Sequence, residues 1–173
     1  MADPQLIFEK YRLVKRIAIG GMGEIFLARQ SDTLIDRFVI LKSMLPDLAA
    51  DQTWVDQFLG EARVAATLNH PNIVSIYEVG AWEGIYYIAM EYIPGVDLAE
   101  LLFTSFPLDH RRVIRIVEQI CFGLDEAHAC GVLHRDLKPE NIMVSDRRNM
   151  SDFVKVLDFG IAKLQDEVSG IDA

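Results

Sequence analysis

The sequence predicts an α+β protein with a strand-rich N-terminal part and a later part that contains a long helix. Short runs of branched and aromatic residues alternate with turn residues up to about residue 92, and one run with helical spacing interrupts them. Ile93-Pro94-Gly95 then closes the strand-rich part and marks the expected boundary between the two parts.

The N-terminal part contains five expected strands and one expected helix. The strands are the runs at 11–19, 24–30, 37–43, 73–80 and 85–92. The helix spans about 51–68, because apolar side chains recur there at spacings of three and four. Those side chains are Val55, Phe58, Ala62, Ala65 and Leu68.

The later part begins with a short helix at 96–103 and a long one at 110–129. The long helix should end at Gly131, a residue suited to a C-cap. Strand-like pieces are expected at 132–136, 141–144 and 153–160. One side of the long helix is apolar and carries Val113, Val117, Ile120, Leu124 and Ala127.

Composition excludes several classes of protein. The chain has 173 residues and is 51% hydrophobic, enough for a folded core. With 17 basic and 26 acidic residues its net charge is −9, which argues against nucleic-acid partners. No run reaches the ~18 apolar residues of a membrane helix, and the N-terminus does not resemble a signal peptide. Cys121 and Cys130 lie nine apart on a helix, too far for a disulfide, which favours a reducing, cytoplasmic setting.

A glycine turn lies between the first two expected strands, in I-A-I-G-G-M-G-E-I-F-L-A. Gly20 and Gly23 match the G-x-G-x-x-G pattern, but Ala18 occupies its first position. A dinucleotide-binding turn would open a helix, whereas residues 24–29 are expected to form a strand. The turn alone therefore leaves two interpretations open, a phosphate-binding loop and an ordinary hairpin turn.

The segment H-R-D-L-K-P-E-N, His134–Asn141, carries a more specific signal. Asp136 can accept a hydrogen bond from an attacking hydroxyl, and Lys138 can neutralise charge on a transferring phosphoryl group. Asn141 and the aspartate of D-F-G, Asp158, offer the hard oxygen ligands that Mg²⁺ prefers. Each residue alone could be a solvated loop side chain, but together they indicate phosphoryl transfer.

These motifs resemble those of eukaryotic-type serine/threonine protein kinases over residues 8–165, and the stretches around the glycine turn and L-N-H-P-N-I-V are similar to the bacterial branch. Lys138 favours serine/threonine over tyrosine specificity. The resemblance implies a protein-kinase-like two-lobe fold: a lead-in at 1–10, an N-lobe at 11–93 with a five-stranded antiparallel sheet and one C-helix, and an incomplete, mainly helical C-lobe at 94–173 that stops within the activation loop.

The resemblance also assigns roles to individual residues. The catalytic residues comprise an aspartate base, a lysine that neutralises the transferring group, a lysine that holds the α- and β-phosphates, and a glutamate that pairs with this second lysine; in that order they are Asp136, Lys138, Lys42 and Glu61. The Mg²⁺ ligands are Asn141 and Asp158. The ATP-binding residues, which cover the glycine turn and the adenine pocket, are Ile17, Ala18, Gly20, Gly21, Gly23, Ile25, Ile40, Lys42, Met90, Glu91, Ile93 and Met143.

By this resemblance the protein transfers the γ-phosphoryl group of ATP to serine or threonine hydroxyls of proteins, with Mg²⁺, in bacterial signal transduction. Arg135 implies control by a phosphorylated activation loop, in which Ser169 is a candidate phosphosite. His134 and Phe159 are expected to be packing residues. Expected partners are ATP and a protein substrate, with no nucleic acid, no membrane segment in this chain and further domains beyond residue 173.

Two substitutions depart from the family pattern. Ala18 replaces the first glycine, and Ile40 stands where alanine is usual and should crowd the adenine pocket. Because the chain stops inside the activation loop, apolar surface on helix 110–129 should be exposed. A non-catalytic, pseudokinase-like nucleotide-binding regulatory module is therefore the alternative. A small-molecule phosphotransferase is a third hypothesis, against which Lys138 argues.

Overall fold

The computed structural model describes residues 7–8, 10–31, 36–147 and 150–159. The chain groups into two compact units. The first comprises Met1–Ala62 and Ile76–Tyr92, and the second comprises Arg63–Ser75 and Ile93–Ala173. Residues 63–75, which the sequence prediction assigned to the N-lobe, group with the second unit.

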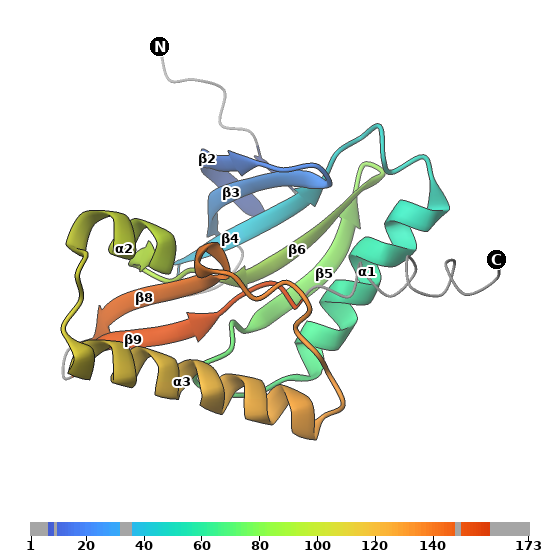
Figure 1. Ribbon diagram of the computed structural model, residues 1–173. Helices are drawn as coiled ribbons and strands as arrows, with labels where there is room; N and C mark the ends of the chain where they lie inside the picture. Colours follow the sequence, from blue (N-terminus) through green and yellow to red (C-terminus); the bar gives the residue numbers. More distant parts are fainter. Residues whose placement is uncertain (1–6, 9, 32–35, 148–149, 160–173) are drawn as a thin grey trace, which may run out of the picture. The chain divides into compact units, whose positions relative to one another are not determined.

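The first unit contains one antiparallel sheet with the strand order β1-β2-β3-β4-β6-β5 (Figure 1). The predicted five-stranded antiparallel sheet is confirmed, and a short edge strand, β1 (Ile7–Phe8), adds to it. Phe8 anchors β1, because its ring is buried against Trp82 and Tyr87. The five predicted strands are β2 (Tyr11–Ile19), β3 (Gly23–Gln30), β4 (Arg37–Met44), β5 (Ile76–Trp82) and β6 (Ile85–Glu91).

The predicted start of β5 at residue 73 was wrong. Ile73 and Val74 pair with Val156 instead, through a parallel bridge and a hydrogen bond from the amide of Val74 to the carbonyl of Val156 at 3.0 Å. Ile73 and Val74, which the local pattern assigns to the strand at 73–80, thus pair with a residue that lies 82 positions after Val74 in the sequence. β5 begins only at Ile76.

The predicted helix after β4 is present as α1 (Gln52–Thr67). Its apolar spacing places Val55, Phe58 and Ala62 in the buried interior of the first unit. A separate apolar cluster on the sheet consists of Phe8, Tyr11, Ala28, Val39, Leu41, Tyr87 and Ala89.

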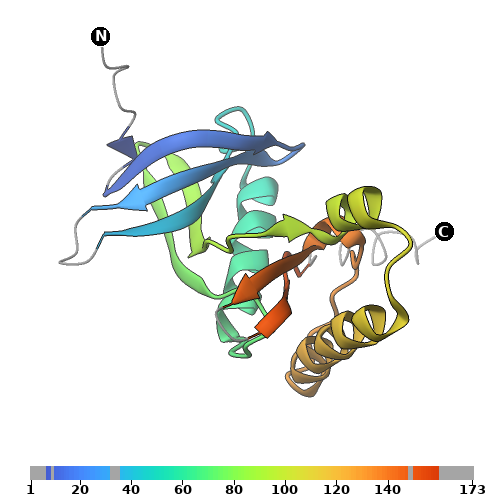
Figure 2. The ribbon, with the colours of Figure 1, turned by 90° about the vertical axis from the view of Figure 1, so that its left-hand side faces the viewer.

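The second unit combines a three-stranded antiparallel sheet, in the order β7-β8-β9, with two helices (Figure 2). Its elements are β7 (Val96–Asp97), α2 (Leu98–Ser105), α3 (His110–Ala129), the 3₁₀ turn η1 (Pro139–Asn141), β8 (Ile142–Arg147) and β9 (Met150–Val156). The bounds predicted for α3 are confirmed. Both views show α3 running alongside β9, and its core side chains include Ile116 and Ala127.

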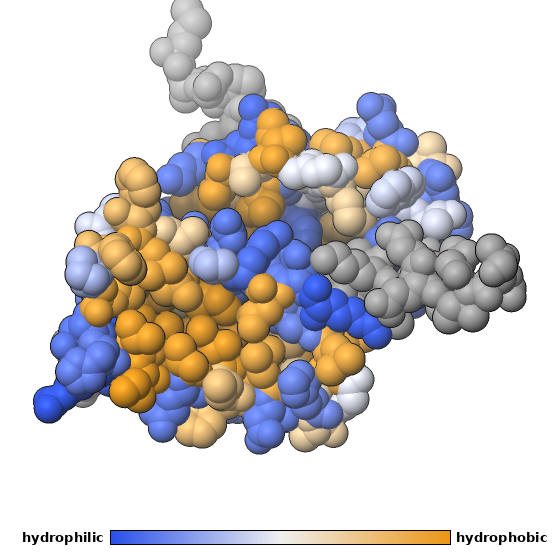
Figure 3. Space-filling view, viewed as in Figure 1, coloured by the Kyte–Doolittle hydropathy of each residue, from blue (hydrophilic) through white to orange (hydrophobic). Residues whose placement is uncertain are grey.

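Apolar side chains also gather on the surface of the second unit, over α2 and α3 (Figure 3). Val113 and Val117, which the sequence stripe assigned to the inward face of α3, are exposed, together with Ile114 and Phe122. The expected exposed apolar surface on this helix is therefore present. Within the described part of the chain, no helix has the length and apolar character needed to span a membrane.

Candidate active site

The loop after α3 carries the predicted catalytic residues. Cys130 caps α3, and Gly131 has a φ of +75°, a left-handed conformation that favours glycine and turns the chain out of the helix. The strand predicted at 132–136 was wrong, because this segment is a loop. The amide of Asp136 donates to the carbonyl of His134 at 2.8 Å, and Arg135 between them has a φ of +60°. A backbone that turns so tightly cannot continue as a strand.

The carboxylate of Asp136 is held by two neighbours from the same loop. Nζ of Lys138 lies 2.8 Å from Oδ2 of Asp136, and Nδ2 of Asn141 donates to the same oxygen at 3.3 Å and to the Asp136 carbonyl at 2.9 Å. The hydrogen bond with Asp136, reinforced by its charge, raises the pKa of Lys138. Asp136 remains 38% exposed, so it can reach a reactant while its orientation is fixed.

His134 connects this loop to the end of β9. Its Nε2 lies 2.8 Å from the carbonyl oxygen of Leu157, and the amide of Asp136 approaches its Nδ1 at 3.4 Å. A neutral imidazole with its proton on Nε2 serves both contacts. Burial lowers the pKa of His134, although the Leu157 hydrogen bond and the charges of Asp136 and Asp158 oppose the shift. The ring packs against Phe159, 4.8 Å between centroids, so both side chains have the packing role expected of them.

Asn141 and Asp158 flank the β8–β9 hairpin at its open end, one just before β8 and the other just after β9. β8 begins at Ile142, β9 ends at Val156, and the amide of Leu157 donates to the carbonyl of Asn141 at 2.8 Å. Asp158 has a φ of +42°, a conformation that costs about 1–3 kcal/mol in a non-glycine residue and that concentrates at functional sites.

The chemistry of these two residues fits Mg²⁺. The hydrogen bonds to Asp136 engage Nδ2 of Asn141 and leave its Oδ1 as the atom that could bind a cation, and Asp158 offers a carboxylate. Among the residues that the structure describes, no cluster of three or more His, Cys, Asp or Glu side chains forms a metal site. Mg²⁺ is usually bound by one or two protein oxygen ligands together with substrate phosphates, so this pair is suited to a cation that accompanies a nucleotide.

The glycine turn of the first unit is closed by its own backbone. The amide of Gly20 donates to the carbonyl of Gly23 at 2.8 Å. A Cβ on Gly23 would lie 2.2 Å from the carbonyl oxygen of Ser43 on β4, whereas a Cβ on Gly21 would meet nothing within 4 Å. Gly23 is therefore required by the close approach of β4, and the other two glycines keep the turn free of side chains.

Strand register places five of the predicted ATP-binding residues on one face of the sheet. Directly opposite residues of antiparallel strands share a face, as do residues two apart on one strand. Ala18 pairs with Ile25, and Ile25 pairs with Lys42. Ile40 lies two residues before Lys42 and pairs with Met90. The aromatic core of the unit lies on the opposite face.

The remaining predicted residues are less closely grouped. Ile17 is exposed on β2, and Glu91 ends β6. Glu61 lies on α1, but its side chain is outside the described part of the structure. Ile93, which is buried, and Met143, which is half-buried on β8, belong to the second unit.

The predicted site residues thus form two groups, one in each unit. Gly160 of D-F-G, the start of the activation loop and Ser169 lie outside the described residues. Sequence reasoning missed the side chains of α3 that reach the β8–β9 hairpin, Arg112, Arg115 and Gln119. Their spacing of three and four along a helix was the signal that could have identified them.

The protein kinase domain family matches residues 11–170, which is most of the chain. The chain belongs to the protein kinase family. The kinase domain of PknI from Mycobacterium tuberculosis has the same fold, with a TM-score of 0.74 and 32% sequence identity over 94% of this chain and 63% of that one. The predicted kinase-like fold is confirmed by this likeness.

Bacterial serine/threonine-protein kinases are among the curated relatives of this kinase domain. It is 51% identical over 158 residues to the serine/threonine-protein kinase pkn3 of Myxococcus xanthus, which covers 91% of this chain and 28% of that protein. It is 40% identical over 153 residues to the serine/threonine-protein kinase PrkC of Bacillus subtilis, covering 88% and 23% of the two. The chain therefore spans about a quarter of the length of these relatives.

Proposed function

We propose that the intact protein is an ATP- and Mg²⁺-dependent serine/threonine protein kinase and that this chain holds the nucleotide and carries the base for phosphoryl transfer. The observation that carries the proposal is the Asp136 carboxylate, held by Nζ of Lys138 at 2.8 Å and Nδ2 of Asn141 at 3.3 Å. Membership of the kinase family and the names of the bacterial relatives support the same assignment.

In this mechanism Asp136 orients the serine or threonine hydroxyl and accepts its proton as the oxygen bonds to the γ-phosphorus and the bond to the β–γ bridging oxygen breaks, releasing ADP. Lys138 neutralises charge on the transferred group. The turn amides at Gly21–Gly23 and the ammonium group of Lys42 hold the phosphates of ATP. Asn141 and Asp158 would hold Mg²⁺, which supplies positive charge to the phosphate oxygens.

Phosphoryl transfer from labelled ATP to the protein itself and to a generic protein substrate tests the proposal in the intact protein. Asp136→Ala should lower kcat by about 10²–10⁴-fold, the usual contribution of a positioned base. Lys42→Ala should raise the KM for ATP and lower kcat. Asp125→Ala and Lys15→Ala remove exposed groups of the same types and should match the wild type.

Binding of Mg²⁺ and ATP without transfer in the wild-type protein would favour the pseudokinase-like module instead. Transfer to a small metabolite, with proteins left unmodified, would favour the small-molecule phosphotransferase.

The cytoplasmic location is part of the same proposal. Cys121 and Cys130 are both exposed, and neither forms a disulfide. Exposed free thiols stay reduced in a reducing compartment such as the cytosol, where ATP is also available. Thiol labelling in intact cells with a membrane-impermeant reagent should leave both cysteines unmodified.

A further inference from the structure

Asp152 is a buried carboxylate outside the predicted site. Its side chain is only 5% exposed, and its φ is +56°. It lies at an irregularity of the β8–β9 hairpin, where the pairing shifts between Ser145 and Arg147. The amide of Asp152 donates to Oδ1 of Asp146, the residue that the shifted pairing skips, at 3.1 Å. A desolvated aspartate in a left-handed conformation persists only where its surroundings hold it.

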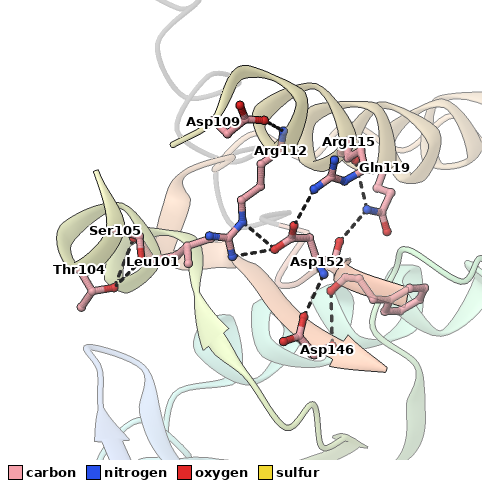
Figure 4. Close-up of polar contacts among 11 residues, drawn as sticks. Leu101, Thr104, Ser105, Asp109, Arg112, Arg115, Gln119, Asp146 and Asp152 are labelled. Carbon is pink, nitrogen blue, oxygen red and sulfur yellow. Dashed lines mark hydrogen bonds and ion pairs between the residues drawn. The ribbon is translucent and has the colours of Figure 1, made fainter. Parts of the chain in front are cut away.

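α3 supplies those surroundings from one face (Figure 4). Arg112 reaches Oδ1 of Asp152 from Nε at 2.8 Å and from Nη2 at 2.7 Å, and Nη2 of Arg115 reaches Oδ2 at 3.3 Å. Nε2 of Gln119 donates to the main-chain carbonyl of Asp152 at 2.7 Å. We call Asp152, Arg112, Arg115 and Gln119 the Asp152 clamp. Charge-assisted contacts on the side chain and a hydrogen bond on the backbone fix both parts of the same residue.

The clamp extends along β9 toward the candidate site. Oε1 of Gln119 accepts hydrogen bonds from the amide of Val154 at 3.0 Å and from Nδ2 of Asn72 at 3.2 Å. Asn72 in turn donates to the carbonyl of Val154 at 2.8 Å. Three residues further on, the amide of Leu157 bonds to the carbonyl of Asn141. A shift of β9 along α3 would therefore move the backbone that supports Asn141 and Asp158 at the open end of the hairpin.

We propose that Asp152 is a positioning residue of this kinase: by anchoring the β8–β9 hairpin to α3, it sets the placement of Asn141 before β8 and of Asp158 after β9. The inference rests on the proposed function, because it concerns how the two Mg²⁺ ligands of that function are held. Removing the clamp leaves both ligands in the chain but loosens their support, so a higher Mg²⁺ concentration should be needed for half-saturation. The ATP-binding residues of the first unit should be unchanged.

The test uses the intact protein and measures its melting temperature with ATP alone and with ATP during a titration of Mg²⁺. Asp152→Ala should keep the shift caused by ATP alone and raise the half-saturating Mg²⁺ concentration about tenfold, the lower range for losing an outer support of a metal ligand. Arg112→Gln should have a smaller effect. Arg115→Gln should have the smallest, because its contact is longer and its side chain more exposed.

Asp36→Ala is the matched control, since it removes a carboxylate that pairs with Arg29 at 2.6 Å on the exposed surface. It should leave the Mg²⁺ titration as in the wild type. A residue with a purely structural role would lower the melting temperature of the unliganded protein and leave the half-saturating Mg²⁺ concentration unchanged, and that result would overturn the proposal. If Asp152→Ala does not fold, Arg112→Gln decides the question.

Phosphoryl transfer, measured in parallel, separates this inference from the proposed function. Wild-type protein that binds ATP with Mg²⁺ but transfers nothing would contradict kinase activity, and the Mg²⁺ titration would still decide the role of Asp152. Active wild-type protein with unchanged Mg²⁺ dependence in all clamp variants would contradict the positioning role alone.

Discussion

Gly23 is the glycine of the turn whose missing side chain matters most for packing. Gly23→Ala would place its Cβ 2.2 Å from the carbonyl oxygen of Ser43, a backbone atom that cannot swing aside. We expect a loss of about 1–3 kcal/mol in the free energy of unfolding, typical of overpacking, and weaker ATP binding because the turn shifts. Urea unfolding and ATP titration measure both effects. Gly21→Ala is the control for the unfolding measurement and should leave the free energy of unfolding nearly unchanged, since its Cβ meets nothing within 4 Å; equal losses of stability in the two variants would refute the packing argument.

The buried imidazole of His134 should make stability depend on pH. Its pKa in the folded chain lies below the ordinary 6.5, so the unfolded chain binds more protons as the pH falls. The contribution is therefore fully present above pH 6.5 and is lost as the pH falls through the folded pKa. His134→Phe retains a ring beside Phe159 but has no titrating group, so the free energy of unfolding should decline less between pH 7 and pH 5.

Unfolding titrations at several pH values check this prediction. His128→Phe removes an exposed histidine from α3 and should retain the wild-type slope. If His134→Phe has the same slope as the wild type, another group is responsible for the acid sensitivity.

At the scale of elements, α3 depends on its N-terminal cap. Oδ1 of Asp109 accepts hydrogen bonds from the amides of Arg111 at 3.0 Å and Arg112 at 3.3 Å. Asp109→Ala should lower the free energy of unfolding by about 0.5–2 kcal/mol, the usual cost of losing such a cap. Asp125→Ala makes the same substitution at an exposed position within α3 and should be neutral or slightly stabilising. Thermal and urea unfolding of the pair provide the measurement.

Elements with strong local pattern could be predicted from the sequence, and those that depend on distant partners could not. β2 and α3 begin and end at the residues that the apolar pattern predicts, because local periodicity determines their secondary structure. The start of β5 was misplaced because Ile73 pairs with Val156. The apolar residues at 132–136 predict a strand, but the segment is a loop. Its turn depends on the contact of His134 with the carbonyl of Leu157, which the local pattern does not contain.

The same distinction applies to the candidate site. Asp136, Asn141 and Asp158 could be proposed from the sequence, because they occupy fixed places in short motifs that resemble a known family, and their roles stay predictions. Asp152 belongs to no motif, and its importance arises only when the hairpin lies alongside α3. Asp97 caps α2, because its Oδ1 accepts a hydrogen bond from the amide of Glu100 at 2.8 Å, and an acidic residue three positions before a glutamate at a helix start is a signal that the sequence does carry.

For the molecule as a whole, the apolar surface over α2 and α3 should govern its solution behaviour. Ile114 is 61% exposed, whereas its near neighbour Ile116 is 2% exposed. Ile114→Gln should therefore reduce binding of an apolar fluorescent dye and reduce self-association while leaving stability nearly unchanged. Ile116→Ala should instead cost about 2–5 kcal/mol, because it opens a cavity in the core.

Dye fluorescence, light scattering and urea unfolding of the two variants distinguish surface from core. Similar dye binding by Ile114→Gln and the wild type would show that other side chains dominate the exposed surface.

The pairing of the turn at residues 70–74 with β9 has a consequence for synthesis. Asn72 and Val154, which bond at 2.8 Å, are 82 residues apart, so this turn leaves the ribosome long before its partner strand exists. At about 5–20 residues per second, roughly 4–16 s separate the two events. Within that interval the first unit receives its last residue, Tyr92, while the polar groups of the turn still form hydrogen bonds with water. The first unit, which contains the glycine turn, can therefore fold first during synthesis. The second unit can fold only after β9 has been made.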